Sequence, residues 1–201
     1  ELKYQHQAKK IFGRTPAMID FFGKLLDYPF PWPKYDQIVV RNFVSGAMEN
    51  TSASVFNESL QSGKGELVDH DWDGIIAHEL FHQWFGDLVT LESWANLPLN
   101  ESFANYAEYL WDEKRLGRDD ADLNGFKEKY QYLFESSNKR EPLIRYLHDK
   151  PDDMFDSHSY AKGGRVLHLL RQELGDQAFF DGLSLYLKRH AFKTVEIHDL
   201  R

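Results

Sequence analysis

The sequence predicts an α+β fold in which a small β-sheet lobe and a mainly helical lobe flank a cleft. The stretch from Gln37 to Val44 is rich in β-branched and aromatic residues, and Ser54 to Phe56 returns as a further short strand. Most of the remaining chain has apolar residues at helical spacing. No internal repeat is found, and 201 residues suffice for a sizeable core. We therefore expect one domain over 1–201, with a mixed helix and strand lobe over 1–70 and a helical lobe over 71–201.

The overall composition is that of a packed globular protein. Apolar residues make up 42% of the chain, so disorder is not expected. The formal charge of −8 argues against a nucleic-acid partner. The chain has no cysteine, which excludes disulfides and thiolate chemistry but leaves the compartment open. No segment approaches the roughly 18 uninterrupted apolar residues of a membrane span, so none is expected in this segment. The chain starts at Glu1, directly in a segment with a helical pattern, which suggests that it is a piece of a longer protein.

The first 33 residues predict two helices and a loop. Residues 1–13 have the pattern of a helix end. Thr15 followed by Pro16 is typical of an N-cap and a first helical position, and the helix so begun should run to about Asp27. Three prolines between Tyr28 and Pro33 then predict a rigid, extended aromatic loop.

The second half of the chain predicts further helices. One runs from Arg118 to about Ser137 and is followed by a loop with two prolines, another opens at Tyr160, and a third spans Asp176 to about Ala191. A last helical stretch is expected to begin after Thr194.

The segment His78-Glu79-Leu80-Phe81-His82 has the spacing of a metal site on a helix. Residues four apart lie on one helical face, so His78 and His82 can reach one ion, while Glu79 can point at a water bound to that ion. Apolar residues cover nearly the whole helix, which is expected to run to about Phe85 with Asp71 or Asp73 as its cap. Uncompensated polar groups on a buried helix are costly, which favours a metal.

Glu101 is the expected third ligand. It follows His82 by 18 intervening residues and opens a second strongly helical segment. Two histidines and one glutamate leave the fourth position of a zinc ion open, as catalytic zinc sites require. Asn105 and Glu108 share the face of Glu101 and are candidates to hold the outer nitrogens of the ligand histidines.

Three separate motifs follow one another along the chain: first Gly46, Ala47, Met48, Glu49 and Asn50, then the His78–His82 segment with its Glu101, then Tyr160-Ala161-Lys162-Gly163. In residue type and in order they resemble the motifs of the gluzincin aminopeptidases, the family related to aminopeptidase N and the leukotriene-processing hydrolase. Two departures are Ser102, where many relatives have Gly, and the run Ser93 to Pro98, where relatives show a Trp/Asp-rich run. Neither departure touches a ligand.

The resemblance implies a thermolysin-like domain that holds one Zn²⁺ and removes single residues from peptides with a free N-terminus. It implies that Glu79 is the general base, that Tyr160 donates to the oxyanion and that residues 46–50 bind the substrate, with Glu49 on its α-amine. It also implies a β-rich domain before this module, which contributes a further amine-binding acid, and a helical domain after it.

Two alternatives remain open from the sequence. One is an epoxide hydrolase that acts on a lipid, because the leukotriene-processing branch shares these motifs; Gly46-Ala47-Met48 resembles the aminopeptidase version more. The other is a catalytically inactive peptide-binding module, against which the intact Glu79 and Tyr160 argue. The side-chain preference, the physiological substrate and the oligomeric state are not predicted.

Overall fold

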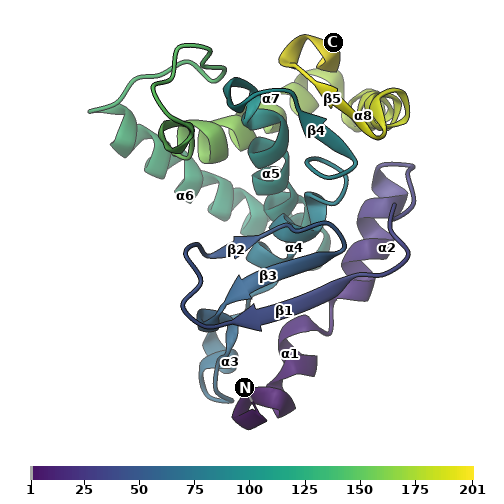
Figure 1. Cartoon of the computed structure of the whole chain (residues 1–201), viewed down its shortest axis with the longest axis vertical. Coiled ribbons are helices and arrows are strands. Elements are labelled where there is room, and N and C mark those ends of the chain that lie inside the picture. The colour runs from purple at the N-terminus through teal and green to yellow at the C-terminus, as the bar shows by residue number, and fades with distance from the viewer. Residues whose placement is uncertain (1) are drawn as a thin grey trace.

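The computed structural model describes residues 2–201, so the part of the predicted first helix at Glu1 lies outside the described residues. A 3-10 helix, Leu2–Gln7, leads into α1, Ala8–Phe12, and α2, Thr15–Leu25, which run beside a small sheet at the N-terminal end of the molecule (Figure 1). The helical elements of the second half lie on the other side of α4, Asp73–Phe81 (Figure 1). The fold is thus mixed α and β, as the sequence predicts.

The predicted capping role of Thr15 is wrong. Arg14 is the N-cap residue of α2, and Thr15 is its first helical residue, ahead of Pro16. The Thr15 hydroxyl instead donates to Oε1 of Gln37 at 2.9 Å, so it joins α2 to the sheet. The helix ends at Leu25, two residues before Asp27, which has a φ of 44°.

The sheet has three strands in the order β1-β3-β2. β1, Asp36–Val40, is parallel to β3, Ala53–Asn57, with Ile38 opposite Val55. β2, Ala47–Met48, is antiparallel to β3 and forms an edge of the sheet. The predicted strand to Val44 is too long, because the chain bends after Val40 and Asn42 has a φ of 55°.

The helix α4, which carries the expected metal ligand His78 and also Glu79, is shorter than predicted. It ends at Phe81, and His82 is its C-cap residue, still in a right-handed helical conformation. Turns then lead to Gly86, whose φ of 146° favours glycine. Asp71 accepts a hydrogen bond from the Asp73 amide at 3.2 Å, as a residue at the helix start can. The N-cap residue is Trp72, so neither Asp71 nor Asp73 takes the expected cap position.

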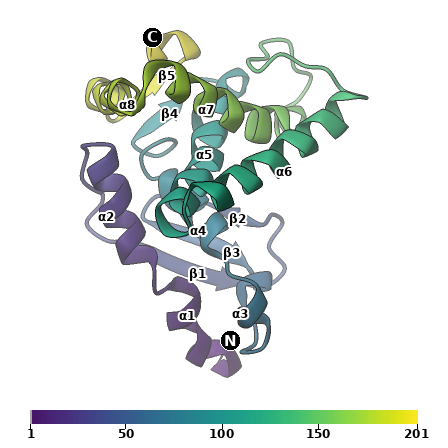
Figure 2. The same ribbon diagram turned by 180° about the vertical axis from the view of Figure 1, so that it is seen from behind.

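Four long helices follow. α5, Pro98–Arg115, packs against α4, and α6, Arg118–Ser136, packs against α5 and lies in front in the view of Figure 2. α7, Gly163–Leu174, packs on α5 and is followed by α8, Asp176–His190. A short 3-10 helix, Pro151–Met154, lies in the loop after α6. Three further short helices lie before α5: Glu58–Leu60, Glu66–Asp69 (α3) and Trp94–Asn96.

Two details of the C-terminal half differ from the prediction. Tyr160 lies in a π-helix, His158–Lys162, that continues into α7, rather than at the start of an α-helix. After α8 the chain forms β5, Lys193–Val195, parallel to β4, Val89–Leu91, and only then a short 3-10 helix, Ile197–Leu200. The expected helix after Thr194 is thus one turn long, because this segment first pairs as a strand.

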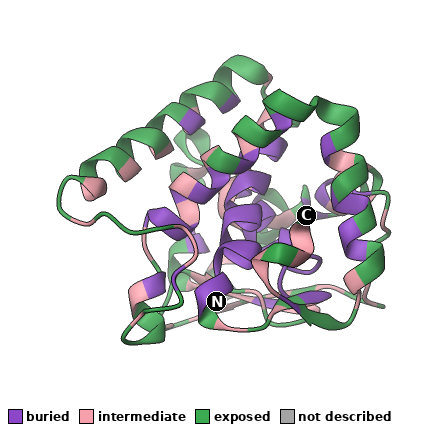
Figure 3. Ribbon diagram, turned by 90° about the horizontal axis from the view of Figure 1, so that it is seen from above, coloured by how far each residue is buried: buried purple, intermediate pink, exposed green. Residues whose placement is uncertain are grey.

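The main core lies where α2, α4, α5 and α8 meet, and buried residues concentrate in the central helices (Figure 3). Phe85 and Phe103 stack with ring centroids 4.4 Å apart, which joins the turn after α4 to α5. Phe22 of α2 meets Phe81 edge to face at 4.9 Å. Among residues 2–201, no helix is both long enough and apolar enough to cross a membrane.

Candidate metal centre and cleft

The three expected ligands converge at one point. Nε2 of His78 lies 3.2 Å from Oε2 of Glu101, and Nε2 of His82 lies 3.3 Å from the same oxygen. All three residues are buried, and their ligand atoms lie within 4.8 Å of one another. Two imidazole nitrogens and one carboxylate around a common point form a donor set that fits zinc and leaves a fourth position.

The outer nitrogen of each imidazole has a partner. Nδ1 of His78 lies 2.8 Å from Oε1 of Glu108, and Nδ1 of His82 lies 3.0 Å from the carbonyl oxygen of Phe85. Such partners fix the ring orientation and leave Nε2 free for a metal. Asn105, the other candidate for this position, does not bond either ring and donates to Oε1 of Glu128 at 2.9 Å.

Buried polar contacts fix α4 relative to its neighbours. Asp73, at the first residue of α4, is 1% exposed. Its carboxylate accepts from Arg14 at 3.0 Å and from the indole nitrogen of Trp111 at 3.0 Å, and Nε of Arg115 lies 3.2 Å away. Because α5 carries both Trp111 and Glu101, this contact also fixes the ligand of α5 relative to His78 on α4.

The ligands are electrostatically coupled. Burial alone would lower the pKa of both imidazoles, but the Glu101 carboxylate outweighs it, so the pKa of His82 rises to about 9 and that of His78 well above its usual range. Burial likewise opposes ionisation of Glu101, yet the two histidines hold its pKa far below the ordinary value. The site therefore favours a carboxylate beside positive charge, whether that charge is on protons or on a metal ion.

Glu79 lies next to the ligands and lacks a full set of partners. It is 6% exposed, and its Oε2 has no hydrogen-bond partner. Burial raises the pKa of this carboxyl to about 7, although the nearby histidines oppose the rise. A buried carboxylate oxygen without a partner, adjacent to a metal ligand set, is available to bind water or substrate.

Tyr160 faces the ligands from the π-helix His158–Lys162. Its ring stacks on that of His78 with centroids 6.0 Å apart and planes 16° from parallel. Burial and the charge of Glu101 raise the pKa of the phenol above its ordinary value, so the hydroxyl stays a proton donor. Single π-turns in helices are frequent at functional sites.

The ligands, Glu79 and Tyr160 line one cleft with a volume of about 810 Å³. Its opposite wall is the edge strand β2 with flanking residues, among them Gly46, Met48 and Glu49. Of the five residues in the 46–50 segment, Gly46 to Glu49 line the cleft. Asn50 is exposed and is not among the lining residues; its carbonyl accepts from the Ala53 amide at 2.7 Å, which closes the turn into β3.

Gln83 is a residue of this site that the sequence did not single out. It is fully buried, and both ends of its side-chain amide bind the loop that carries Glu49. Nε2 donates to the carbonyl of Glu49 at 2.9 Å, and Oε1 accepts from the amide of Ser52 at 2.7 Å. The sequence does contain an indication of this role. Gln83 lies in an apolar run directly after His82, and a buried glutamine is costly unless its amide has hydrogen-bond partners.

The comparisons with known proteins agree with this geometry. The model of the peptidase family M1 domain matches residues 11–201. The chain belongs to peptidase family M1. Over 96% of its length this M1 domain is 37% identical to aminopeptidase N of Streptomyces lividans, and over 90% it is 35% identical to aminopeptidase N of Homo sapiens. It spans 24% and 20% of the length of these relatives.

Solved structures of M1 proteins share the fold of this M1 domain. A mutant M1 zinc metallopeptidase from Deinococcus radiodurans, bound to a Tyr-Ser-Ala substrate, matches with a TM-score of 0.75 and 29% identity, covering 94% of this chain and 39% of that one. Yeast LTA4 hydrolase in complex with bestatin matches with a TM-score of 0.80 and 26% identity, covering 91% of this chain and 30% of that one. The expected fold and family are thereby confirmed.

Proposed function

We propose that the full-length protein is a zinc aminopeptidase that hydrolyses the N-terminal peptide bond of peptides. The observation that carries this proposal is the composition of one cleft, which combines a zinc-type ligand set with Glu79, Tyr160 and, on the opposite wall, Glu49. Because the chain spans about a fifth to a quarter of the relatives' length, residues 1–201 are proposed as the catalytic domain between flanking domains.

His78, His82 and Glu101 would hold one zinc ion per chain. When bound, zinc supplies Lewis acidity, which polarises a carbonyl and lowers the pKa of water toward about 7. The chain's own contribution is a ligand set whose outer nitrogens are held by Glu108 and Phe85, so that the rings keep their orientation.

Glu79 is the proposed general base. Its burial and its pKa of about 7 suit a group that must take a proton from water and return it to the leaving amine near neutral pH. General acid–base catalysis of this kind contributes typically about 10² to 10⁴-fold in rate.

Tyr160 is the proposed donor to the developing oxyanion. A neutral phenol whose ring stacks on that of His78 can donate to a carbonyl oxygen of a substrate bound at the ligand set. Its effect would be larger in the transition state, because negative charge grows on that oxygen only as the carbonyl is attacked.

Glu49 is the proposed anchor for the substrate's α-amine. The edge strand β2 offers unpaired backbone groups to an extended peptide, and Glu49 follows directly at the end of this strand. A carboxylate at the end of such a subsite would bind the α-amine of the peptide's first residue. The first peptide bond would then lie at the ligands. The Gln83 clamp holds the backbone of Glu49 in place.

Hydrolysis of a lipid epoxide is the second candidate, because yeast LTA4 hydrolase shares the fold with a TM-score of 0.80. The relatives at 35% to 37% identity are aminopeptidases, which favours the peptidase. Among the solved structures, identity is 29% to the M1 zinc metallopeptidase and 26% to LTA4 hydrolase. A peptide-binding module without catalysis is disfavoured, since both Glu79 and Tyr160 are present and face the cleft.

A panel of fluorogenic aminoacyl substrates on the intact protein tests the proposal. Free aminoacyl amides should be cleaved, their N-acetylated counterparts should not, and a chelator should abolish cleavage until zinc is restored. Hydrolysis of a lipid epoxide without cleavage of any aminoacyl amide would support the second candidate. Equal cleavage of free and acetylated substrates would refute exopeptidase action.

A further inference from the structure

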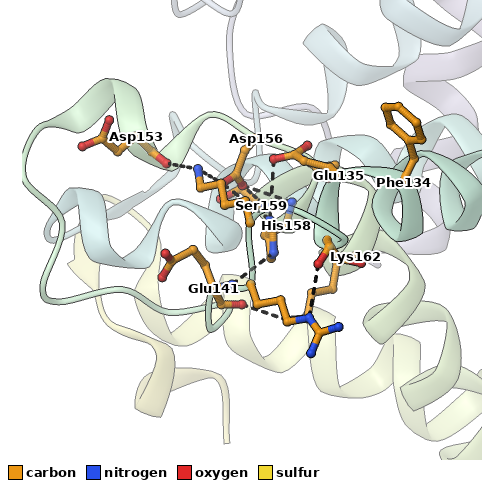
Figure 4. A network of polar contacts seen from close by, with 12 residues as sticks. Phe134, Glu135, Glu141, Asp153, Asp156, His158, Ser159 and Lys162 are labelled. Carbon is orange, nitrogen blue, oxygen red and sulfur yellow. Dashed lines mark hydrogen bonds and ion pairs between the residues drawn. The ribbon is translucent and has the colours of Figure 1, made fainter.

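A buried ion pair lies just ahead of Tyr160 in the chain. The carboxylate of Asp156 accepts two parallel hydrogen bonds from the guanidinium of Arg145, at 2.7 and 2.8 Å, and a third from Nζ of Lys139 at 2.5 Å. Arg145 is 5% exposed. Figure 4 shows Asp156 at the centre of this network, next to His158 and Ser159.

This cluster is not a second metal site. Glu135, Asp156 and His158 have ligand atoms within 4.8 Å of one another, but two cationic side chains already neutralise Asp156. Nε2 of His158 accepts from the amide of Glu141 at 3.2 Å, so in the neutral ring the proton is on Nδ1. Nδ1 is the nitrogen that faces Asp156 at 3.5 Å and Glu135 at 3.8 Å, and a protonated Nδ1 cannot bind an ion. The cluster is an ion-pair network centred on Asp156, and its role is structural.

That task is visible in the contacts of Asp156 with the π-helix. Its Oδ1 accepts from the amides of His158 at 3.0 Å and Ser159 at 3.2 Å, in the manner of a helix N-cap. Its carbonyl oxygen accepts from the amide of Tyr160 at 3.2 Å. The first turn of the segment that carries the Tyr160 ring is therefore built on Asp156.

The opposite side of the same turn is attached to α5. The hydroxyl of Ser102, next to the ligand Glu101, donates to the carbonyl of Ser159 at 2.7 Å. The hydroxyl of Ser159 accepts from Nη2 of Arg145 at 3.1 Å and donates to the carbonyl of Met154 at 2.6 Å. The turn is thus held between the ligand helix and the Arg145–Asp156 pair.

We propose that Arg145 and Asp156 are positioning residues of the active site, which fix the distance between the Tyr160 hydroxyl and the ligand set. This inference rests on the proposed function, in which Tyr160 donates to the oxyanion. A misplacement of about 1 Å at such a donor costs about 10²-fold in rate, so small shifts of the turn matter. Neither Arg145 nor Asp156 is among the residues that line the cleft, so the pair need not touch substrate.

The test is a double-mutant cycle with Tyr160→Phe in the full-length, zinc-loaded protein. Asp156→Asn keeps the shape of the side chain but removes its charge, and it replaces one acceptor oxygen by an NH₂ group that faces the donors of Arg145 and Lys139. It should lower kcat by about 10- to 100-fold with KM nearly unchanged, up to the loss caused by Tyr160→Phe. In the Tyr160→Phe background it should cause little further loss, because no hydroxyl remains to be positioned.

A milder change provides a second route, because breaking a buried ion pair can prevent folding. Arg145→Lys keeps the charge but not the planar fork, so it should lower kcat less than Asp156→Asn and show the same non-additivity with Tyr160→Phe. Arg171→Lys is the matched control. Arg171 is also buried and binds Asp176 through two hydrogen bonds at 2.8 and 3.0 Å, but it lies on α7 away from the π-helix. Its effect on kcat should be small, and it should be additive with that of Tyr160→Phe.

Hydrogen exchange of the metal-free protein gives a readout independent of activity. The amides of His158, Ser159 and Tyr160 should exchange faster in Asp156→Asn and in Arg145→Lys, and at the wild-type rate in Arg171→Lys. Unchanged exchange in both pair variants, or losses of kcat that multiply with that of Tyr160→Phe, would overturn the positioning role. If the wild type is active and Tyr160→Phe has no effect on kcat, both the positioning role of Arg145 and Asp156 and the role of Tyr160 as oxyanion donor are overturned. A wild type inactive on every substrate would refute the proposed function, while the exchange result would still decide whether the pair orders the turn.

Discussion

Glu108 Oε1 lies 2.8 Å from Nδ1 of His78, while Nε2 of the same ring points at Glu101. The two glutamates come from one helix, α5, seven residues apart, so α5 contacts both nitrogens of a histidine on α4. Gly74, at the start of α4, leaves room for this carboxylate, which comes within 3.3 Å of the position of a β-carbon there.

Glu108→Ala is therefore expected to weaken zinc binding by about 10- to 100-fold, because the ring loses the partner that fixes its orientation. Glu108→Gln, which keeps an oxygen acceptor, should lose less. Competition with a chromogenic chelator measures both. Asp112→Asn, one turn further along α5, is the control and should bind zinc as the wild type does. Equal affinity in wild type and Glu108→Ala would show that the packing of the ring alone is sufficient.

Glu79→Gln should retain zinc while hydrolysis collapses. The amide is nearly isosteric with the carboxylate but cannot accept the proton of water, so about 10²-fold or more in kcat should be lost. Metal analysis of the purified variant, alongside its turnover of an aminoacyl substrate, separates the two properties. Loss of zinc would mean that Glu79 is a ligand and not a base.

Glu49→Ala should abolish the preference for a free α-amine. Wild-type protein is expected to cleave free aminoacyl substrates far better than acetylated ones, and the variant should do so much less, mainly through an increase in KM for the free substrates. Gln83→Met keeps the Glu49 carboxylate but removes the clamp on its backbone, so it should give a partial loss of the same preference. If Glu49→Ala lowered kcat on both substrate types equally, Glu49 would not be the amine anchor.

The sequence predicted the parts of this site that depend on local spacing. His78 and His82 lie four residues apart on a helix and share a face for that reason alone. It could not predict that Glu108 and not Asn105 meets His78, because that choice depends on the crossing of α4 and α5. Arg145 was missed for the same reason, since it lies in a loop without periodicity and meets Asp156 only in the folded chain.

Element boundaries followed tertiary contacts more than local propensity. The helix α4 ends at Phe81 although the helical pattern of apolar residues continues to Phe85. The Phe85 carbonyl is therefore free to form a hydrogen bond with Nδ1 of His82. The helix expected after Thr194 begins only at Ile197, because Lys193–Val195 pairs with β4 as a strand. Such pairings between distant segments cannot be read from the spacing of apolar residues.

The stability contributed by Asp156 should depend on pH in a defined direction. Burial would raise its pKa, but hydrogen bonds from Arg145 and Lys139 outweigh burial and lower it from 3.8 to about 2. The folded state thus favours the charged form, so its stabilising effect is complete above the unfolded pKa and is lost as the pH falls toward about 2. The difference in the free energy of unfolding between wild type and Asp156→Asn should be constant from pH 7 to about 5 and narrow below about pH 4. Urea denaturation of the metal-free proteins at each pH measures this difference, and a gap that widened at low pH would contradict the ion pair.

The contact between Ser102 and Gly163 gives the last prediction. A β-carbon on Gly163 would lie 1.7 Å from Oγ and 2.5 Å from Cβ of Ser102, but 3.5 Å from its Cα. The serine of α5 therefore occupies the space that any side chain at position 163 would need, directly beside the Tyr160 turn.

Gly163→Ala should destabilise the protein by roughly 1 to 3 kcal/mol through overpacking. Ser102→Gly removes both clashing atoms, at a cost of about 1 kcal/mol for a glycine in a helix and about 1 kcal/mol for the lost hydrogen bond to the Ser159 carbonyl. In the double variant the new methyl group meets only Cα at ordinary contact distance, so the two changes should cost less together than the sum of their separate effects. Chemical denaturation of the four proteins measures this coupling. Ser102→Ala is the matched control, because it keeps the Cβ that would lie 2.5 Å from the new methyl group. It should rescue Gly163→Ala less than Ser102→Gly does. Additive effects in both pairs of substitutions would show that α5 and the π-helix move apart to make room.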